Sequence, residues 1–193
     1  MPLTLDDFTQ GAYQKTLLPG QSDSNLQQPP GRQTVFTNGA TSSNPWNQPS
    51  SLAIGIQNRK GILIVSPGFG AACSLFLNYG TFQNDPPGSP LHLNLRAYSS
   101  FQINLAGLSA SVGLTATAVI APHSGGLLYD AGVGIVRPPS ENPFSINYPW
   151  TSFKNGALHL SDIDVSDIDG IQVVLGGGGT TVTYGILSFQ ALP

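Results

Sequence analysis

The sequence predicts an all-β fold, arranged as a single antiparallel β-sandwich that spans residues 1–193. Short apolar segments alternate with polar residues at a period of two, and 23 Gly and 16 Pro residues punctuate the chain between these segments. No segment combines a helical period with caps at both ends. A chain of this length can bury a core without disulfide bonds or a metal ion.

The apolar segments define the expected strands in order along the chain. They cover residues 3–8, 33–37, 51–57, 62–66, 72–79, 91–97, 100–105, 112–121, 131–136, 144–147, 170–175 and 180–191. Residues 21–30 and 41–50 are polar and carry proline, so we expect long loops there. The glycines at 176–179 lack the Lys and the helix of a phosphate-binding loop, and they predict a hairpin turn between Val174 and Val182.

Charge and cysteine content exclude several function classes. The chain has 7 Lys and Arg residues against 10 Asp and Glu residues, with no basic cluster to contact nucleic acid. No apolar run approaches the roughly 20 residues of a membrane-spanning helix, so we expect no membrane insertion. Cys73 is the sole cysteine and is expected to be buried as a small hydrophobic residue.

The first residues, MPLTLDDFTQ, lack the basic and apolar regions of a signal peptide. We therefore expect a cytoplasmic protein if Met1 is the native start, and an extracellular or cell-surface protein if the chain is a mature form. The polar residues are mainly Ser, Thr, Asn and Gln, a composition more usual in extracellular β proteins, which favours the second case.

The strand expected at residues 91–97 presents the most ligand-like row of side chains. Alternation turns its leucines inward and leaves a second row on the outer face, formed by His92, Asn94, Arg96 and Tyr98. Arg supplies a planar fork for hydroxyl or carboxylate groups, and a Tyr ring can stack against a sugar. The alternative interpretation is an ordinary solvated sheet face.

Acidic residues crowd the segment before the strand expected at 170–175. Asp162, Asp164, Asp167 and Asp169 supply oxygens densely enough for calcium, although the EF-hand order is absent. Their alternation with Ile and Val, and the Asp–Gly turn signal at residues 169–170, favour a polar lead-in to a core strand instead. Asp162 and Asp164 are kept as candidate calcium ligands.

Catalytic motifs are absent from the sequence. Glycoside hydrolysis needs two carboxyl groups across a cleft, and nothing in the sequence brings Glu141 and Asp130 together. There is no G-x-S-x-G elbow and no H-E-x-x-H metal motif. The sequence therefore favours a protein without enzymatic activity.

Two tryptophans are candidate contact residues for a sugar. Trp46 lies in the polar loop TSSNPWNQPSS, where a flat apolar ring is suited to the C–H face of a pyranose. Trp150 follows Tyr148 in NYPWTSF and is expected in the core or at its rim. Trp46 is the stronger candidate.

Several phrases resemble, in order, jelly-roll β-sandwich domains of secreted bacterial proteins, which are similar to galactose-binding-like and carbohydrate-binding-module sandwiches. These phrases are LTLDDFTQGAY, GILIVSPGFGAACSLFLNYGT, LNLRAYSSFQINLAGL, PFSINYPWTSF, LSDIDVSDIDGIQVVLGGGG and VTYGILSFQA. The resemblance implies a jelly-roll sandwich in which the first strand pairs beside the last, at residues 185–191. It also implies a second candidate calcium site at Asp6 and Asp7, between these two strands.

Functions of different classes remain open. The leading hypothesis is a non-catalytic binding module of the carbohydrate-binding or adhesion type, with the row from His92 to Tyr98 and Trp46 as contacts. The main alternative is a self-assembling structural subunit of a surface layer, filament or shell, because a surface with little Lys or Glu suits close packing. A glycan hydrolase is a second alternative. The expected partner is a glycan or another copy of the chain, and the one expected cofactor is a structural calcium ion.

Overall fold

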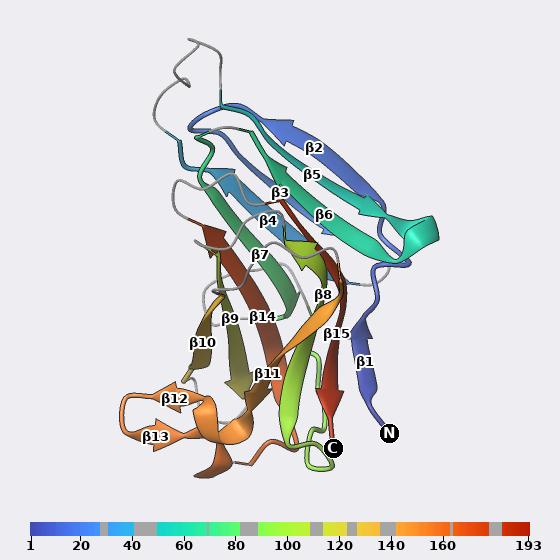
Figure 1. The fold of residues 1–193 in the computed structure, drawn as a ribbon. Helices are drawn as coiled ribbons and strands as arrows, with labels where there is room; N and C mark the ends of the chain where they lie inside the picture. Colours follow the sequence, from blue (N-terminus) through green and yellow to red (C-terminus); the bar gives the residue numbers. More distant parts are fainter. Residues whose placement is uncertain are drawn as a thin grey trace.

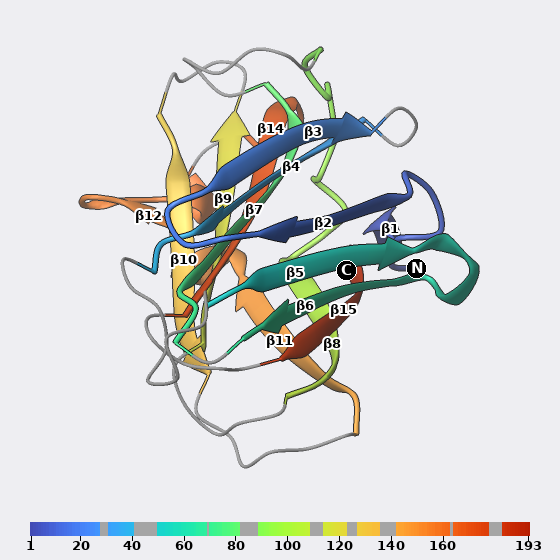
Figure 2. The ribbon, with the colours of Figure 1, turned by 90° about the horizontal axis from the view of Figure 1, so that it is seen from above.

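The structure is a computed structural model, and it describes residues 1–27, 31–40, 50–68, 70–81, 89–108, 114–122, 127–135, 142–162, 164–177 and 183–193. These residues form two antiparallel sheets that pack face to face, as the sequence predicts (Figures 1 and 2). Regular α-helix is absent from the described residues, which include three short 3-10 turns: η1 (Asn58–Lys60), η2 (Trp150–Ser152) and η3 (Leu160–Asp162). No helix in the described part of the chain is long and apolar enough to cross a membrane.

The first sheet has seven strands in the order β11-β8-β15-β6-β5-β2, with β1 also paired to β15. Its strands are β1 (Leu3–Asp6), β2 (Tyr13–Leu17), β5 (Leu52–Gln57), β6 (Ile62–Pro67), β8 (Ser100–Leu108), β11 (Phe144–Pro149) and β15 (Tyr184–Leu192).

The second sheet has eight strands in the order β13-β12-β10-β9-β14-β7-β4-β3. Its strands are β3 (Ser22–Gln27), β4 (Arg32–Asn38), β7 (Cys73–Gly80), β9 (Leu114–Pro122), β10 (Tyr129–Ile135), β12 (Lys154–Asn155), β13 (Leu158–His159) and β14 (Ile168–Gly177).

The core lies between the sheets and follows the period of two in the sequence. Buried positions alternate with partly exposed ones along β4 and β5, because successive side chains of a strand point to opposite faces. The seven-stranded sheet contributes buried Leu63, Phe101 and Ile186, among others, and the eight-stranded sheet contributes Leu75 and Val173. Cys73 is buried as expected, and burial raises the pKa of its thiol to about 11.

The first and last strands lie side by side, which confirms the expected closure of the sandwich. In the register of β1 with β15, Leu3 pairs with Ala191 and Thr4 with Gln190. Both views place the two chain ends close together (Figures 1 and 2).

A buried charged cluster ties the two sheets together. Arg32 of β4 is fully buried, and its guanidinium donates to the carboxylate of Asp6 on β1. That carboxylate also accepts hydrogen bonds of 2.8 Å from Tyr79 Oη on β7 and from the Phe8 backbone N–H. Arg32 Nε donates to Gln27 Oε1 at 3.1 Å, and the guanidinium lies 5.0 Å from the Phe8 ring centroid. Burial raises the pKa of Tyr79, so its hydroxyl remains a donor.

Three sequence predictions are wrong at the level of local structure. The expected loop at 21–30 contains β3, and β2 was also missed; both are polar because they are edge strands. The strands on either side of the glycines, β14 and β15, belong to different sheets and so do not pair as a hairpin; residues 178–182 lie outside the described residues. Asp169 is not in a turn: it is the extra residue of a β-bulge, because the register with β9 passes from Ile168 to Gly170.

Candidate ligand-binding site

The segment predicted as a ligand-binding strand, residues 91–97, is irregular. It is joined to β14 through an isolated bridge between Leu93 and Ile168. His92 has a φ of 48°, a left-handed conformation that interrupts an extended strand. A turn at Arg96 and Ala97 ends the segment, so the predicted row of side chains on one sheet face does not form.

The side chains of that predicted row are engaged by the protein itself. Arg96 forms a bidentate pair with Asp164, with Nη2 3.0 Å from Oδ1 and 2.9 Å from Oδ2. Asn94 Oδ1 accepts from the Arg96 backbone N–H at 3.0 Å. Tyr98 packs against the core, and its carbonyl accepts from Trp150 Nε1 at 2.6 Å. A ligand-binding role for these residues stays a prediction.

The acidic segment meets residues 91–97 at one end of the sandwich. Hydrogen bonds from Ser166, and then the Arg96 guanidinium, hold the pKa of Asp164 below its ordinary value. His92 Nδ1 lies 3.0 Å from Asp167 Oδ1 and 3.9 Å from Asp169 Oδ1. The sequence does not predict this contact, because the two segments are about 70 residues apart in the chain and neither forms a regular strand.

One set of three potential metal ligands occurs among the described residues. The ligand atoms of His92, Asp167 and Asp169 lie within 4.8 Å of one another, a set of imidazole and carboxylate groups that a divalent ion can use. The set includes none of the residues kept as candidate calcium ligands, which are Asp6, Asp7, Asp162 and Asp164. A calcium ion at Asp162 and Asp164 stays a prediction.

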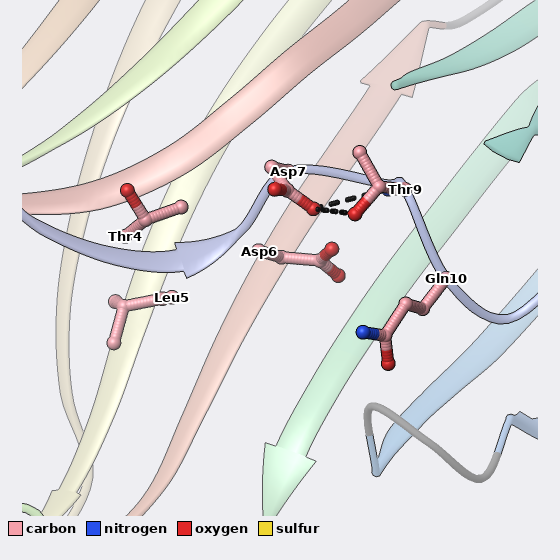
Figure 3. A pocket seen from close by; sticks show the side chains of 6 residues that line it. All are labelled: Thr4, Leu5, Asp6, Asp7, Thr9 and Gln10. Carbon is pink, nitrogen blue, oxygen red and sulfur yellow. Dashed lines mark hydrogen bonds between the residues drawn. The ribbon is translucent and has the colours of Figure 1, made fainter. Parts of the chain in front are cut away.

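The other predicted calcium site, at Asp6 and Asp7, borders a surface hollow of about 250 Å³ beside β1 (Figure 3). Both oxygens of Asp6 accept hydrogen bonds, and a guanidinium already supplies positive charge there. Asp7 is exposed and accepts from Thr9 N at 3.0 Å and Thr9 Oγ1 at 2.6 Å, which lowers its pKa. Calcium here stays a prediction that the competing donors disfavour.

A second candidate site lies on the outward side of the eight-stranded sheet. In β7 the residues Leu75 and Leu77 are buried, so the residues between and beside them point away from the core. We call the outward side of five neighbouring strands the Phe76 face. Its outward residues, strand by strand, are Ser22, Ser24 and Leu26 on β3; Gln33, Val35 and Thr37 on β4; Ser74, Phe76 and Asn78 on β7; Gln172, Val174 and Gly176 on β14; and Thr115, Thr117 and Val119 on β9.

A row of amide side chains crosses this face from strand to strand. Gln172 Nε2 donates to Asn78 Oδ1 at 2.8 Å, and Asn78 Nδ2 donates to Gln33 Oε1 at 3.1 Å. Gln33 Nε2 in turn donates to Ser24 Oγ at 3.1 Å. Each amide can donate two and accept two hydrogen bonds, so the partly exposed Gln33 and Gln172 keep capacity for a ligand.

An apolar row lies next to the amide row. Phe76 pairs with Val35 on one side and with Val174 on the other, and all three are partly exposed. The following row carries small or hydroxyl side chains, including Thr37 and Ser74. The face therefore presents a flat ring between hydrogen-bonding groups.

The Phe76 face carries no charge on its described outward residues. Charged side chains of the described chain lie at strand ends, at edges or inside the core. Asp130 on β10, the strand next to the face, is in register with Val119 of the face on one side and with Lys154 of β12 on the other. Phe76 is hard to assign from the sequence because it stands between two leucines in the apolar triplet Leu75–Phe76–Leu77, where either side of the strand can be the buried one.

Of the two tryptophans, Trp150 belongs to the described residues and Trp46 does not. Trp150 lies at the rim of the core, with its ring 4.7 Å from Phe101 and 5.8 Å from Phe153 between centroids. Its indole N–H donates a hydrogen bond to the Tyr98 backbone carbonyl. Trp46 and Glu141 lie outside the described residues.

No protein-family model and no curated protein matches the chain. Similar solved structures include the family 11 carbohydrate-binding module of the cellulosomal cellulase Lic26A-Cel5E of Clostridium thermocellum, with 11% identity, a TM-score of 0.47, and coverage of 100% of this chain and 94% of that one. A family 11 module from Clostridium thermocellum in complex with a β-1,3-1,4-mixed-linked tetrasaccharide has 9% sequence identity and a TM-score of 0.49, and the match covers 99% of this chain and 95% of that one. The agarase AgWH50C has 13% sequence identity and a TM-score of 0.45, and the match covers 100% of this chain and 25% of that one. These similar structures include carbohydrate-binding modules, the class of sandwich that the sequence pattern resembles.

Proposed function

We propose that the chain is a non-catalytic carbohydrate-binding module that holds a neutral glycan on the Phe76 face. The observation that supports this most is the row of Gln33, Asn78 and Gln172 directly beside the ring of Phe76. Sugars combine an apolar C–H face with a rim of hydroxyl groups. A ring flanked by amides offers a partner to each part.

The spacing of the sheet suits a chain of sugars that crosses the strands. Neighbouring strands lie about 4.8 Å apart, so such a chain meets a new amide at each of β4, β7 and β14. The hydrogen bonds within the row hold each amide in one orientation. Less side-chain entropy is then lost when a ligand binds.

The absence of charge on the described outward residues supports a neutral glycan over an acidic one. Recognition of sulfate or carboxylate groups ordinarily uses Arg or Lys. No such residue points outward from the five strands of the face. As part of this proposal, we expect the chain to act outside the cell or at the cell surface, where glycans are abundant.

Binding to a panel of immobilised neutral and acidic glycans tests the proposal. We expect the wild-type chain to bind at least one neutral glycan and Phe76→Ala to lose that binding, while Phe76→Tyr keeps it because the ring remains. Tyr98→Ala is the matched control, since it removes the ring of the row that the sequence predicted. Loss of binding in Tyr98→Ala with no change in Phe76→Ala would show that the glycan binds near Tyr98, at the end of the sandwich, and not on the Phe76 face.

A further inference from the structure

The outward side of the seven-stranded sheet is a second broad surface without charge. We call it the Gln102 face. Its outward residues are Thr4 on β1; Gln14 and Thr16 on β2; Ala53, Gly55 and Gln57 on β5; Ile62, Ile64 and Ser66 on β6; Ser100, Gln102, Asn104, Ala106 and Gly107 on β8; Ser145, Asn147 and Pro149 on β11; and Gly185, Ser188, Gln190 and Leu192 on β15. Among the described residues at the ends of these strands, Arg59 and Lys60 in η1 and Asp7 after β1 are charged and exposed, whereas Asp6, the last residue of β1, is buried.

One half of this face is a grid of amide and hydroxyl groups over β15, β8 and β11. Gln190 Nε2 donates to Gln102 Oε1 at 2.7 Å, and Gln102 Nε2 donates to Asn147 Oδ1 at 2.8 Å. In the next row the donors run the opposite way, from Ser145 Oγ to Asn104 Oδ1 at 2.6 Å, and from Asn104 Nδ2 to Ser188 Oγ at 2.8 Å. Each row therefore contains both donors and acceptors.

The other half is apolar around Ile62 and Ile64 and carries the polar residues Gln14, Thr16, Gln57 and Ser66 on β2, β5 and β6. Ile62 and Ile64 are partly exposed, and neighbouring positions carry small residues such as Ala106. A Cβ added at Gly185 would lie 2.9 Å from Ile62 Cδ1 and 3.1 Å from Ala106 Cβ, so these two side chains close over the glycine. The result is a continuous surface without a protruding ring or a long charged chain.

The face is large enough for a stable contact between proteins. Its longest strands, β8 and β15, have 9 residues each, which at about 3.3 Å per residue gives a length of roughly 30 Å. The six strands lie about 4.8 Å apart and have 5 to 9 residues each, so the face covers roughly 600 Å². Specific interfaces bury about 600–1,000 Å² per partner, and the face reaches the lower end of this range.

We propose that the Gln102 face is the contact surface of an isologous dimer, with a second copy of this chain as its occupant. Depletion of charge is the compositional mark of an interface centre. Because the amides of this face both donate and accept, the same groups can pair with their copies across a two-fold axis, as an isologous dimer requires. A glycan fits this face less well than the Phe76 face, because no aromatic ring points outward from it.

Sedimentation velocity and light scattering of the full chain, from micromolar to millimolar concentration, test the dimer. We expect a species of twice 20.2 kDa that dissociates on dilution. Gln102→Lys, in the middle of the amide grid over β15, β8 and β11, should weaken association at least tenfold, because it places a charge inside the interface. Ser145→Lys, at an exposed position, is a second variant that should fold and act in the same direction.

Thr117→Lys, which places the same charge on the Phe76 face, is the matched control and should leave the dimer unchanged. A wild-type chain that is monomeric at every concentration overturns the proposal. So does a dimer that survives Gln102→Lys and Ser145→Lys, or one that Thr117→Lys disrupts to the same degree.

Discussion

The outward faces of the two sheets share one chemistry and differ in one feature. Both are free of charge on their described outward residues, and both carry rows of hydrogen-bonded amides, through Asn78 on one sheet and Gln102 on the other. The Phe76 face adds an aromatic ring between two valines, whereas the Gln102 face adds alanines, glycines and two isoleucines. Amide rows are thus a shared property of the two faces, and the apolar groups beside them distinguish the face that we propose for a sugar from the one that we propose for a second copy of the chain.

Removal of Arg32 should have the largest effect, and it should act on both faces together. Its guanidinium on β4 pairs with Asp6 on β1, so it links the sheets that carry the two faces. Arg32→Ala leaves a buried carboxylate without its partner, and we expect a loss of about 3–5 kcal/mol in the free energy of unfolding. Chemical denaturation measures this, and the exposed Arg59→Ala should change stability by less than about 0.5 kcal/mol. Equal stability of the two variants would show that the buried pair does not fix the sandwich.

A matched pair of amide variants tests whether the two faces differ in glycan binding. Gln172→Ala removes the first donor of the row beside Phe76, and we expect glycan affinity to fall by about 1 kcal/mol, roughly fivefold. Gln190→Ala removes the corresponding first donor on the Gln102 face and should leave glycan affinity unchanged. Titration calorimetry compares the two, and equal losses would mean that the amide rows bind glycan without help from the ring.

The smallest effect is expected from the charged end of the sandwich. The pKa of Asp164 is lowered by hydrogen bonds from Ser166 and by Arg96, so this carboxylate stabilises the fold above its ordinary pKa of 3.8 and loses that contribution as the pH falls through its lower value in the folded protein. The melting temperature of Asp164→Asn should therefore approach that of the wild type only at acidic pH. Glycan affinity should not follow this titration, because the Phe76 face is uncharged; an affinity that falls as Asp164 is protonated would place the glycan at the end of the sandwich.

Period-two alternation predicted most of the strands of the sandwich, because most of them bury one row of apolar residues. It failed for β2 and β3, which lie at sheet edges and carry mostly polar residues. It also failed at residues 91–97, where the alternation is regular but the backbone at His92 has a positive φ. A pattern of side chains does not reveal a local break in the backbone.

The candidate sites were harder to predict than the fold. The amide row combines Gln33, Asn78 and Gln172, which are far apart in sequence and meet only through the strand register. A usable signal was present in β7, where Ser74 and Asn78 flank Phe76 at a spacing of two and so mark its side of the strand as the outer one. The partners of Arg96 and His92 could not be foreseen, because they depend on the packing of two irregular segments.

The glycan site on the Phe76 face is tested directly by the affinities of Phe76→Ala and Gln102→Ala for a neutral glycan that the wild type binds, determined side by side by titration calorimetry. Loss of the Phe76 ring should cost about 1–2 kcal/mol, roughly a 5- to 30-fold fall in affinity, while Gln102→Ala should stay within about twofold of the wild type. Equal affinity of Phe76→Ala and the wild type, or a larger loss in Gln102→Ala, would contradict the assignment of the glycan to the Phe76 face.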